Sequence, residues 1–304
     1  MSLWPFAASR DTISTALVLS EALLLGPVGA PRLAPNEPPY GHRFGVFGAA
    51  IFTNETSSRL VAGLLVDSDL IGVPATRVPL LEVPTVLAAL VSLFGSDLLW
   101  LNDAFAYSVT PPSLHVGPGT MLSAASLGTV GAPVTWGASR GVLTAGHVAG
   151  PVGSAAYMAG VRIGDVVFSR DPTGLGHQPD ADVAVVELAA GIAPISGSIT
   201  AAASISDAPS VEVLQQHGRQ YTTVIGKAAW LYVPGYNATY ADAYLTLAEV
   251  TQPGDSGAPM LAAGTTHVVG HVIGSSPGVT SYVQDIALQL AAIRGDPSFA
   301  SIAI

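Results

Sequence analysis

Cysteine is absent from the 304 residues, so the chain can form neither a disulfide framework nor a thiolate site. Basic residues are scarce too: Lys227 is the single lysine, and the formal net charge is −10. Nucleic acids and anionic membrane surfaces are bound by basic patches, so the composition argues against both as partners. The seven histidines show no metal-ligand spacing such as His-Glu-X-X-His, and we expect no metal and no cofactor.

Long hydrophobic runs are also missing. None reaches the ~18 residues of a membrane-spanning helix, so we expect no stable membrane insertion. Ile13–Ala30 comes nearest to a targeting segment, but Glu21 lies in its middle and Pro31 follows it, whereas a secretory signal has a basic flank and an uncharged core. We expect an amphipathic helix here, and both a cytoplasmic and an exported location stay open.

Glycine and proline are plentiful instead, with 33 and 23 residues, which favours many short strands joined by turns. Residues 1–118 are expected to form a small α/β region. In it we predict helices over residues 10–25 and Thr85–Phe94, a strand over Phe44–Phe52, and strand or short helix over Ser57–Leu65. Residues 27–41 are expected to be a loop and residues 103–120 a linker.

Residues 119–304 have a different pattern of apolar and turn residues. Runs rich in Val, Ile and Thr recur between turn residues, and Ile286–Ile293 has the periodicity of a closing helix. The expected strands are Val130–Trp136, Gly141–Ala145, Val161–Ser169, Asp182–Glu187, Ser210–Gln215, Thr222–Ala228, Ala243–Val250, Met260–Ala262, His267–Ile273 and Val279–Tyr282.

The stretch Thr251–Met260 places a serine, Ser256, in a tight turn between two apolar runs. Glycines at 254 and 257 allow a sharp turn that can aim successive N–H groups into one hollow. A serine hydroxyl becomes a good nucleophile only when a base accepts its proton and amide donors receive the developing oxyanion. The rest of the chain should therefore supply a histidine and a carboxylate.

Both residue types occur upstream, each at the end of a predicted strand. His147 follows the run Gly141–Ala145, and Asp182 directly precedes a Val-Ala-Val-Val run. Such a histidine is usually a loop or core residue, and such an acid is usually a turn residue, so neither is informative alone. Together with the serine turn, in the order His, Asp, Ser, they indicate a nucleophilic triad. Asp180 is a rival for the acid, but Asp182 is better placed to reach inward from the mouth of the strand.

With these motifs, residues 119–293 resemble a trypsin-like (chymotrypsin-fold) serine peptidase of the small, cysteine-free bacterial kind. The resemblance implies a mainly β fold of two antiparallel β-barrels, with a boundary near residues 190–208 and a C-terminal helix. The motifs that carry it are Gly128-Thr-Val-Gly-Ala, Leu143-Thr-Ala-Gly-His147, Asp182-Val-Ala-Val, Gly218-Arg-Gln-Tyr-Thr-Thr-Val-Ile-Gly226, Gly254-Asp-Ser-Gly-Ala-Pro259 and Val268-Val-Gly-His-Val-Ile-Gly274.

By this resemblance Ser256 is the nucleophile, His147 the general base and Asp182 the acid that orients it. The N–H groups of Gly254 and Ser256 would form the oxyanion hole, and Asp255 would pin the turn. The implied activity is that of a serine endopeptidase working through an acyl-enzyme on a protein or peptide substrate. The alternative is a silent or latent protease-fold module that binds an extended peptide.

The sequence departs from the family pattern at two points. Gly146 stands where the family usually has alanine, which should loosen the turn before the histidine, and the family's Arg-Ile-Val-Gly-Gly activation site is absent. The resemblance places the primary pocket at five residues without charge, which favours a small or apolar substrate side chain. A register slip of one residue would instead turn His271 into the pocket and favour an acidic side chain. The five pocket residues are Val250, Thr251, Val272, Ile273 and Gly274.

Overall fold

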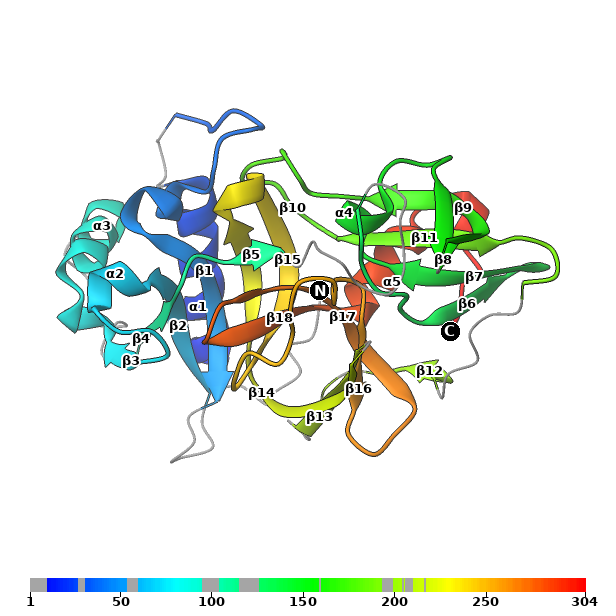
Figure 1. Ribbon diagram of the computed structural model, residues 1–304. Helices are drawn as coiled ribbons and strands as arrows, with labels where there is room; N and C mark the ends of the chain where they lie inside the picture. The colour runs from blue at the N-terminus through cyan, green and yellow to red at the C-terminus, as the bar shows by residue number, and fades with distance from the viewer. Residues whose placement is uncertain are drawn as a thin grey trace.

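The computed structural model describes residues 10–26, 31–53, 60–94, 104–114, 126–158, 160–192, 199–203, 205, 210–215 and 217–304. Two sheets dominate these residues, one of thirteen strands and one of five. The helices α1 to α3 lie at one end of the molecule and the five-stranded sheet at the other, with strands β13 to β18 between them (Figure 1). Among the described residues, no helix is both long and apolar enough to span a membrane.

The N-terminal region builds one edge of the large sheet and covers a face of it with helices. Strand β2 pairs in parallel with β4 and antiparallel with β1. The strands are β1 (Val46–Thr53), β2 (Leu60–Asp67), β3 (Arg77–Pro79) and β4 (Phe105–Val109). The helices are α1 (Arg10–Leu25), α2 (Ser68–Ile71) and α3 (Pro84–Phe94), with short 3-10 turns at Tyr40–Phe44 and Leu80–Glu82.

The large sheet continues into the C-terminal half in the order β10-β15-β18-β17-β16-β13-β14 before it reaches β1, and β5 and β12 each pair with β17. The 3-10 turn Pro234–Tyr236 joins β14 to β15. These strands are β5 (Ser113–Leu114), β10 (Pro179–Asp180), β12 (Ala201–Ala202), β13 (Ser210–Gln215), β14 (Gly218–Val233), β15 (Ala238–Thr246), β16 (Pro259–Ala262), β17 (His267–Ser276) and β18 (Thr280–Asp285).

The small sheet is antiparallel, in the order β6-β7-β11-β9-β8. Helix α5 packs its apolar side against this sheet, with Leu290 and Ile293 in one cluster with Leu143 and Val183. The elements are β6 (Pro133–Trp136), β7 (Ser139–Thr144), α4 (Gly146–Ala149), β8 (Ala155–Met158), β9 (Val161–Arg170), β11 (Val183–Leu188), α5 (Ile286–Arg294) and a last 3-10 turn, Pro297–Phe299.

Strand β14 joins the two halves of the chain, because it pairs with β15 and with β1 at the same time. Alternate side chains of a strand point to opposite faces of its sheet. Leu231 and Val233 lie in a core shared with β15 and β18, whereas Trp230 and Tyr232 lie in a second core under α1 and α3. The Trp230 indole also donates to the Ser20 carbonyl of α1 at 3.0 Å. The N-terminal region therefore shares a continuous sheet with the rest of the chain.

Most of the expected elements are present. The expectation of a mainly β chain with a C-terminal helix is confirmed, and α1 covers the predicted residues. The linker expected over residues 103–120 is wrong in part, because residues 105–109 and 113–114 form β4 and β5; residues 115–120 lie outside the described part. The division at residue 118 stays a prediction, and most of the expected barrel boundary near 190–208 is also undescribed.

The lone lysine is buried where the large sheet meets α5. Lys227 is 1% exposed, and its Nζ lies 2.7 Å from Asp285 Oδ2 and 3.7 Å from Asp242 Oδ1. The Tyr244 hydroxyl donates to the same Asp285 oxygen at 2.9 Å, and the other Asp285 oxygen accepts the Ala287 N–H at the start of α5. One cation thus balances the carboxylate that caps α5.

We expect Lys227→Met to lower the free energy of unfolding by about 3–5 kcal/mol, because it leaves the Asp285 carboxylate without its cation in a buried position. Urea unfolding followed by tryptophan fluorescence measures the change. The double variant Lys227→Met/Asp285→Asn removes both charges and should recover part of the loss. A single variant as stable as the native chain would contradict the role of this pair.

Candidate active site

The serine turn lies between β15 and β16 and is held from both sides. Gly254 and Gly257 have φ of +99° and +90°, which glycine adopts without strain. The Asp255 carboxylate accepts the Gln252 N–H at 2.9 Å, so Asp255 pins the turn. Thr129, which precedes β6, donates its hydroxyl to the Gly254 carbonyl and its N–H to the Ser256 carbonyl, both at 2.7 Å. The turn is therefore tied to the segment that leads into the small sheet.

The two amides expected to form the oxyanion hole are those of Gly254 and Ser256. Their carbonyls accept from Thr129, but neither N–H has an acceptor within the described part of the chain. Unpaired amides on a rigid turn are the kind of donor that stabilises a developing oxyanion.

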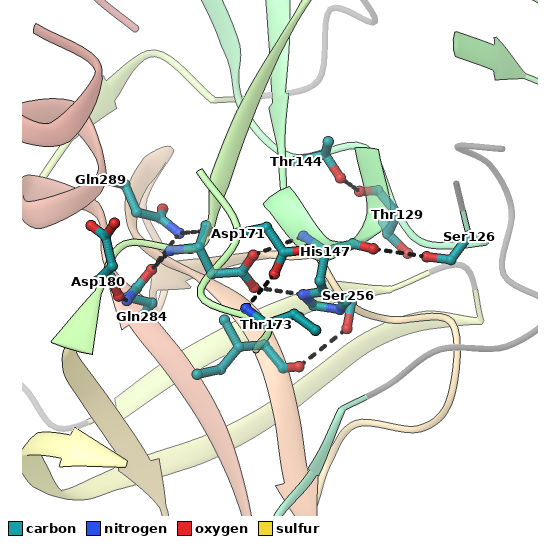
Figure 2. A network of polar contacts seen from close by, with 12 residues as sticks. Ser126, Thr129, Thr144, His147, Asp171, Thr173, Asp180, Ser256, Gln284 and Gln289 are labelled. Atoms are coloured by element: carbon teal, nitrogen blue, oxygen red, sulfur yellow. Dashed lines mark hydrogen bonds and ion pairs between the residues drawn. The ribbon is translucent and has the colours of Figure 1, made fainter. Parts of the chain in front are cut away.

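Ser256 is fully buried, and its hydroxyl donates to the Ile273 carbonyl of β17 at 3.2 Å. In Figure 2 the Ser256 side chain lies beside the imidazole ring of His147, with its hydroxyl turned toward that carbonyl. The His147 Nε2 atom is buried and has no hydrogen-bond partner in the described residues. No hydrogen bond joins the Ser256 hydroxyl to His147 Nε2 in this conformation.

His147 is held by Asp182 through two contacts. The Asp182 Oδ2 atom lies 2.6 Å from His147 Nδ1, and Oδ1 accepts the His147 backbone N–H at 3.0 Å (Figure 2). Burial lowers the pKa of His147, but the charge and hydrogen bond of Asp182 outweigh it and leave the pKa above its ordinary value. The imidazolium form is therefore stabilised by the carboxylate, as a general base requires.

In the structure Asp182 contacts His147, whereas Asp180 does not. Asp180 forms an ion pair with Arg170 at 3.0 Å, and a third of its side chain is exposed. Asp182 is fully buried at the start of β11, and its main chain is bound by two glutamines from the C-terminal part of the chain. Its N–H donates to Gln284 Oε1 at 2.7 Å, and its carbonyl accepts from Gln289 Nε2 at 3.0 Å.

Gly146, which was expected to loosen the turn before His147, is tightly packed instead. A Cβ atom on Gly146 would overlap the Arg170 carbonyl oxygen of β9 and would lie 3.1 Å from Asp182 Oδ1. The expectation of a looser turn is therefore wrong. The missing methyl lets β9 and Asp182 approach the short helix α4 closely.

The five predicted pocket residues lie close together, but most are enclosed. Val272 and Ile273 are at most 1% exposed and belong to two core clusters, and the Thr251 hydroxyl donates to Ser281 Oγ at 2.7 Å. Val250 is half-buried, and Gly274 pairs with Leu114 of β5 and with Tyr282 of β18. Their role as a specificity pocket stays a prediction.

His271 does not point toward this group. It is fully buried, its Nε2 accepts the Ala132 N–H at 3.1 Å, and its Nδ1 lies 2.8 Å from Gln289 Oε1. Burial lowers the pKa of His271 to about 4, so the ring is neutral near pH 7. His271 therefore does not turn toward the five predicted pocket residues, and the preference for a substrate side chain stays a prediction.

Sequence reasoning missed Thr129 as the clamp of the serine turn, and it missed Gln284 and Gln289 altogether. Thr129 lies within a motif that was recognised, Gly128-Thr-Val-Gly-Ala, but its partners are more than 120 residues away. The two glutamines belong to no motif. A polar residue between Leu288 and Leu290 on an apolar helix is the only signal that could have pointed to Gln289. Among the described residues, no group of three or more His, Asp or Glu side chains is arranged to hold a metal.

Neither a protein-family model nor a curated protein matches this sequence. Among solved structures, the chain is similar to a glutamic acid specific serine protease, with 19% identity, a TM-score of 0.45, and coverage of 58% of this chain and 92% of that chain. It is also similar to the Nocardiopsis protease NAPase, with 20% identity, a TM-score of 0.44, and coverage of 62% and 97%. For the Cellulomonas bogoriensis chymotrypsin the identity is 23%, the TM-score 0.42, and the coverage 59% and 94%.

We expect Gly146→Ala to destabilise the chain by about 1–3 kcal/mol and to separate His147 from Asp182, because the new methyl must displace the Arg170 carbonyl. Thermal unfolding reports the first effect. The downfield proton NMR signal of His147 Nδ1–H reports the second. Gly235→Ala is the matched control, since a Cβ there meets open space. A Gly146→Ala variant with native stability and an unchanged signal would contradict this close packing.

Proposed function

We propose that the chain is a serine endopeptidase that hydrolyses peptide bonds through an acyl-enzyme, with Ser256 as nucleophile, His147 as general base and Asp182 as the acid that orients it. The observation that carries the proposal is the 2.6 Å contact between His147 Nδ1 and Asp182, with Ser256 beside the same ring. This contact keeps the Nδ1 proton in place and leaves Nε2 as the basic nitrogen.

The first step requires a rotation of the Ser256 side chain. The Ser256 hydroxyl, which donates to the Ile273 carbonyl, turns about χ1 to donate to His147 Nε2. His147 accepts the proton as the oxygen attacks the scissile carbonyl carbon, and the carbonyl oxygen becomes an oxyanion bound by the amides of Gly254 and Ser256. The imidazolium then gives its proton to the leaving amine. A water molecule, deprotonated by the same ring, hydrolyses the ester and restores Ser256.

The substrate that fits this site is an extended peptide. Peptides commonly bind by adding a strand to the edge of a sheet, and β17 passes directly beside Ser256. The five residues expected to form the pocket carry no charge, which favours a small or apolar side chain at the position before the cleaved bond.

We expect a fluorophosphonate to label the folded protein at Ser256 and to leave Ser256→Ala unlabelled. Asp182→Asn should slow labelling by up to about ten-thousandfold, since it removes the carboxylate that sets the tautomer of His147. Asp180→Asn is the matched control, because Asp180 binds Arg170 instead, and it should label at the native rate. The rates are read from intact-protein mass spectra. The peptidase proposal fails if neither the native chain nor the β5 variant described below is labelled.

We further propose that the peptidase is latent in the folded chain. Ser256 has no exposed surface, and His147 Nε2 is buried. Ser113 and Leu114 of β5 pair with Ser275 and Gly274 of β17, next to the Ile273 carbonyl that accepts the Ser256 hydroxyl. The edge that an extended substrate would use is therefore paired with the chain's own backbone.

Releasing β5 should activate the enzyme. In an antiparallel pair only alternate residues donate to the neighbouring strand, so Ser113→Pro/Leu114→Pro removes whichever of the two N–H groups faces β17. We expect fluorophosphonate labelling to accelerate by about tenfold or more, since reactivity scales with the fraction of chains in the competent state. Ser113→Ala/Leu114→Ala keeps both N–H groups and should remain slow. Equal labelling rates in the native chain and the proline variant would exclude latency through β5 and leave the peptidase proposal intact.

A further inference from the structure

Both main-chain groups of Asp182 are bound by side chains that none of the sequence motifs contains. Gln284 comes from β18 and Gln289 from α5, and both are fully buried. Both oxygens of the Asp182 carboxylate contact His147, and within the described residues no other hydrogen bond to them is seen. The position of the carboxylate is consequently fixed through the main chain of Asp182.

From this arrangement we infer that Gln289 is a positioning residue for the reaction proposed above: with His271 behind it, it holds the Asp182 main chain so that the carboxylate meets His147. The inference rests on the proposed function for its catalytic meaning. Its structural content, the alignment of Asp182 with His147, can be measured without any activity.

The direction of every hydrogen bond in this chain of contacts is determined. The Ala132 N–H can only donate, so it makes His271 Nε2 an acceptor and places the ring proton on Nδ1. His271 Nδ1–H then donates to Gln289 Oε1, which turns the amide nitrogen of Gln289 toward the Asp182 carbonyl. Reversing the Gln289 amide would set two donors against each other and two acceptors against each other. The amide thus has a single satisfied orientation.

Gln284 takes a different part in the same network. Its Oε1 accepts the Asp182 N–H, while its Nε2 donates to the Asp180 carbonyl at 3.0 Å and to the Ala241 carbonyl at 2.8 Å. It therefore ties the segment before β11 to β15. Gln289 alone connects Asp182 to His271 and, through it, to Ala132 of the small sheet. A substitution of Gln289 therefore tests this connection more directly than a substitution of Gln284.

The test uses the full-length chain with Ser256→Ala as the background, so that neither catalysis nor self-cleavage affects the measurement. In histidine-¹⁵N-labelled protein, the downfield Nδ1–H signal of His147 reports the contact with Asp182, and the assignment comes from its loss in His147→Gln. We expect Gln289→Met, which keeps the length of the side chain and removes the amide, to shift or broaden this signal beyond detection.

Trp230→Phe is the matched control for lost stability. It also removes a buried side-chain donor to a backbone carbonyl, that of Ser20, but it lies in the core under α1 and α3. We expect it to lower the unfolding temperature and to leave the His147 signal unchanged. If Gln289→Met lowers the unfolding temperature to the same extent and also leaves the His147 signal in place, Gln289 is an ordinary packing residue and the inference is wrong.

The rate of fluorophosphonate labelling is measured in the chain that keeps Ser256. Where the native chain is labelled by a fluorophosphonate, Gln289→Met should slow labelling by about tenfold to a hundredfold, the usual consequence of misplacing a catalytic group by a fraction of an ångström to an ångström. The peptidase proposal would be overturned if neither the native chain nor Ser113→Pro/Leu114→Pro were labelled, whereas the NMR comparison would still decide whether Gln289 positions Asp182.

The unsubstituted chain supplies a second measurement if Gln289→Met does not fold. Long-range ¹H–¹⁵N couplings distinguish the two neutral tautomers of histidine. We expect His271 to carry its proton on Nδ1 near pH 7. A proton on Nε2 would require the reverse orientation of the Gln289 amide, and it would overturn the inference without any variant.

Discussion

A carboxylate without access to water is the constraint on which the rest of this site depends. Removing an ionised group from water costs several kcal/mol unless it is paired and hydrogen-bonded. Asp182 meets this condition at every polar atom: its two carboxylate oxygens contact His147, its N–H contacts Gln284, and its carbonyl contacts Gln289. Loss of any of these contacts leaves an unsatisfied group in the interior, so the surrounding fold has little freedom to rearrange.

These contacts cross the seam between the two sheets. Asp182 and His147 belong to the small sheet and its short helix α4, whereas the serine turn and Gln284 belong to the large sheet. Thr129 binds the serine turn from the side of the small sheet, and His271 binds Ala132 from the side of the large sheet. Ser256 and His147 are therefore held by reciprocal hydrogen bonds across the seam, and their relative placement depends on how the two sheets dock.

The sequence predicted the parts of this arrangement that local patterns encode. Ser256 lies in a glycine-bounded turn, and His147 and Asp182 each lie at the end of an apolar run, so short motifs were enough to find them. The long β14 was underestimated, because Ala229 to Val233 form a continuous apolar run that periodicity alone cannot assign. Gln289 could not be found, because its meaning depends on contacts with residues 18 and 107 positions away.

The N-terminal region shows how a single sheet can connect distant parts of one chain. Strand β4 is anchored by Tyr107 and Val109 in the core shared with β14 and β15, and Thr110 bonds to the β17–β18 turn through the Ser276 hydroxyl and the Pro277 carbonyl. Only residues 110–114 cross from this anchor to the edge of β17. Because β5 pairs with β17 over only two residues, that pairing can open while Tyr107 and Val109 stay in their core. A short strand held at one end by a stable core can therefore leave the edge of β17 more readily than a longer strand with more paired residues.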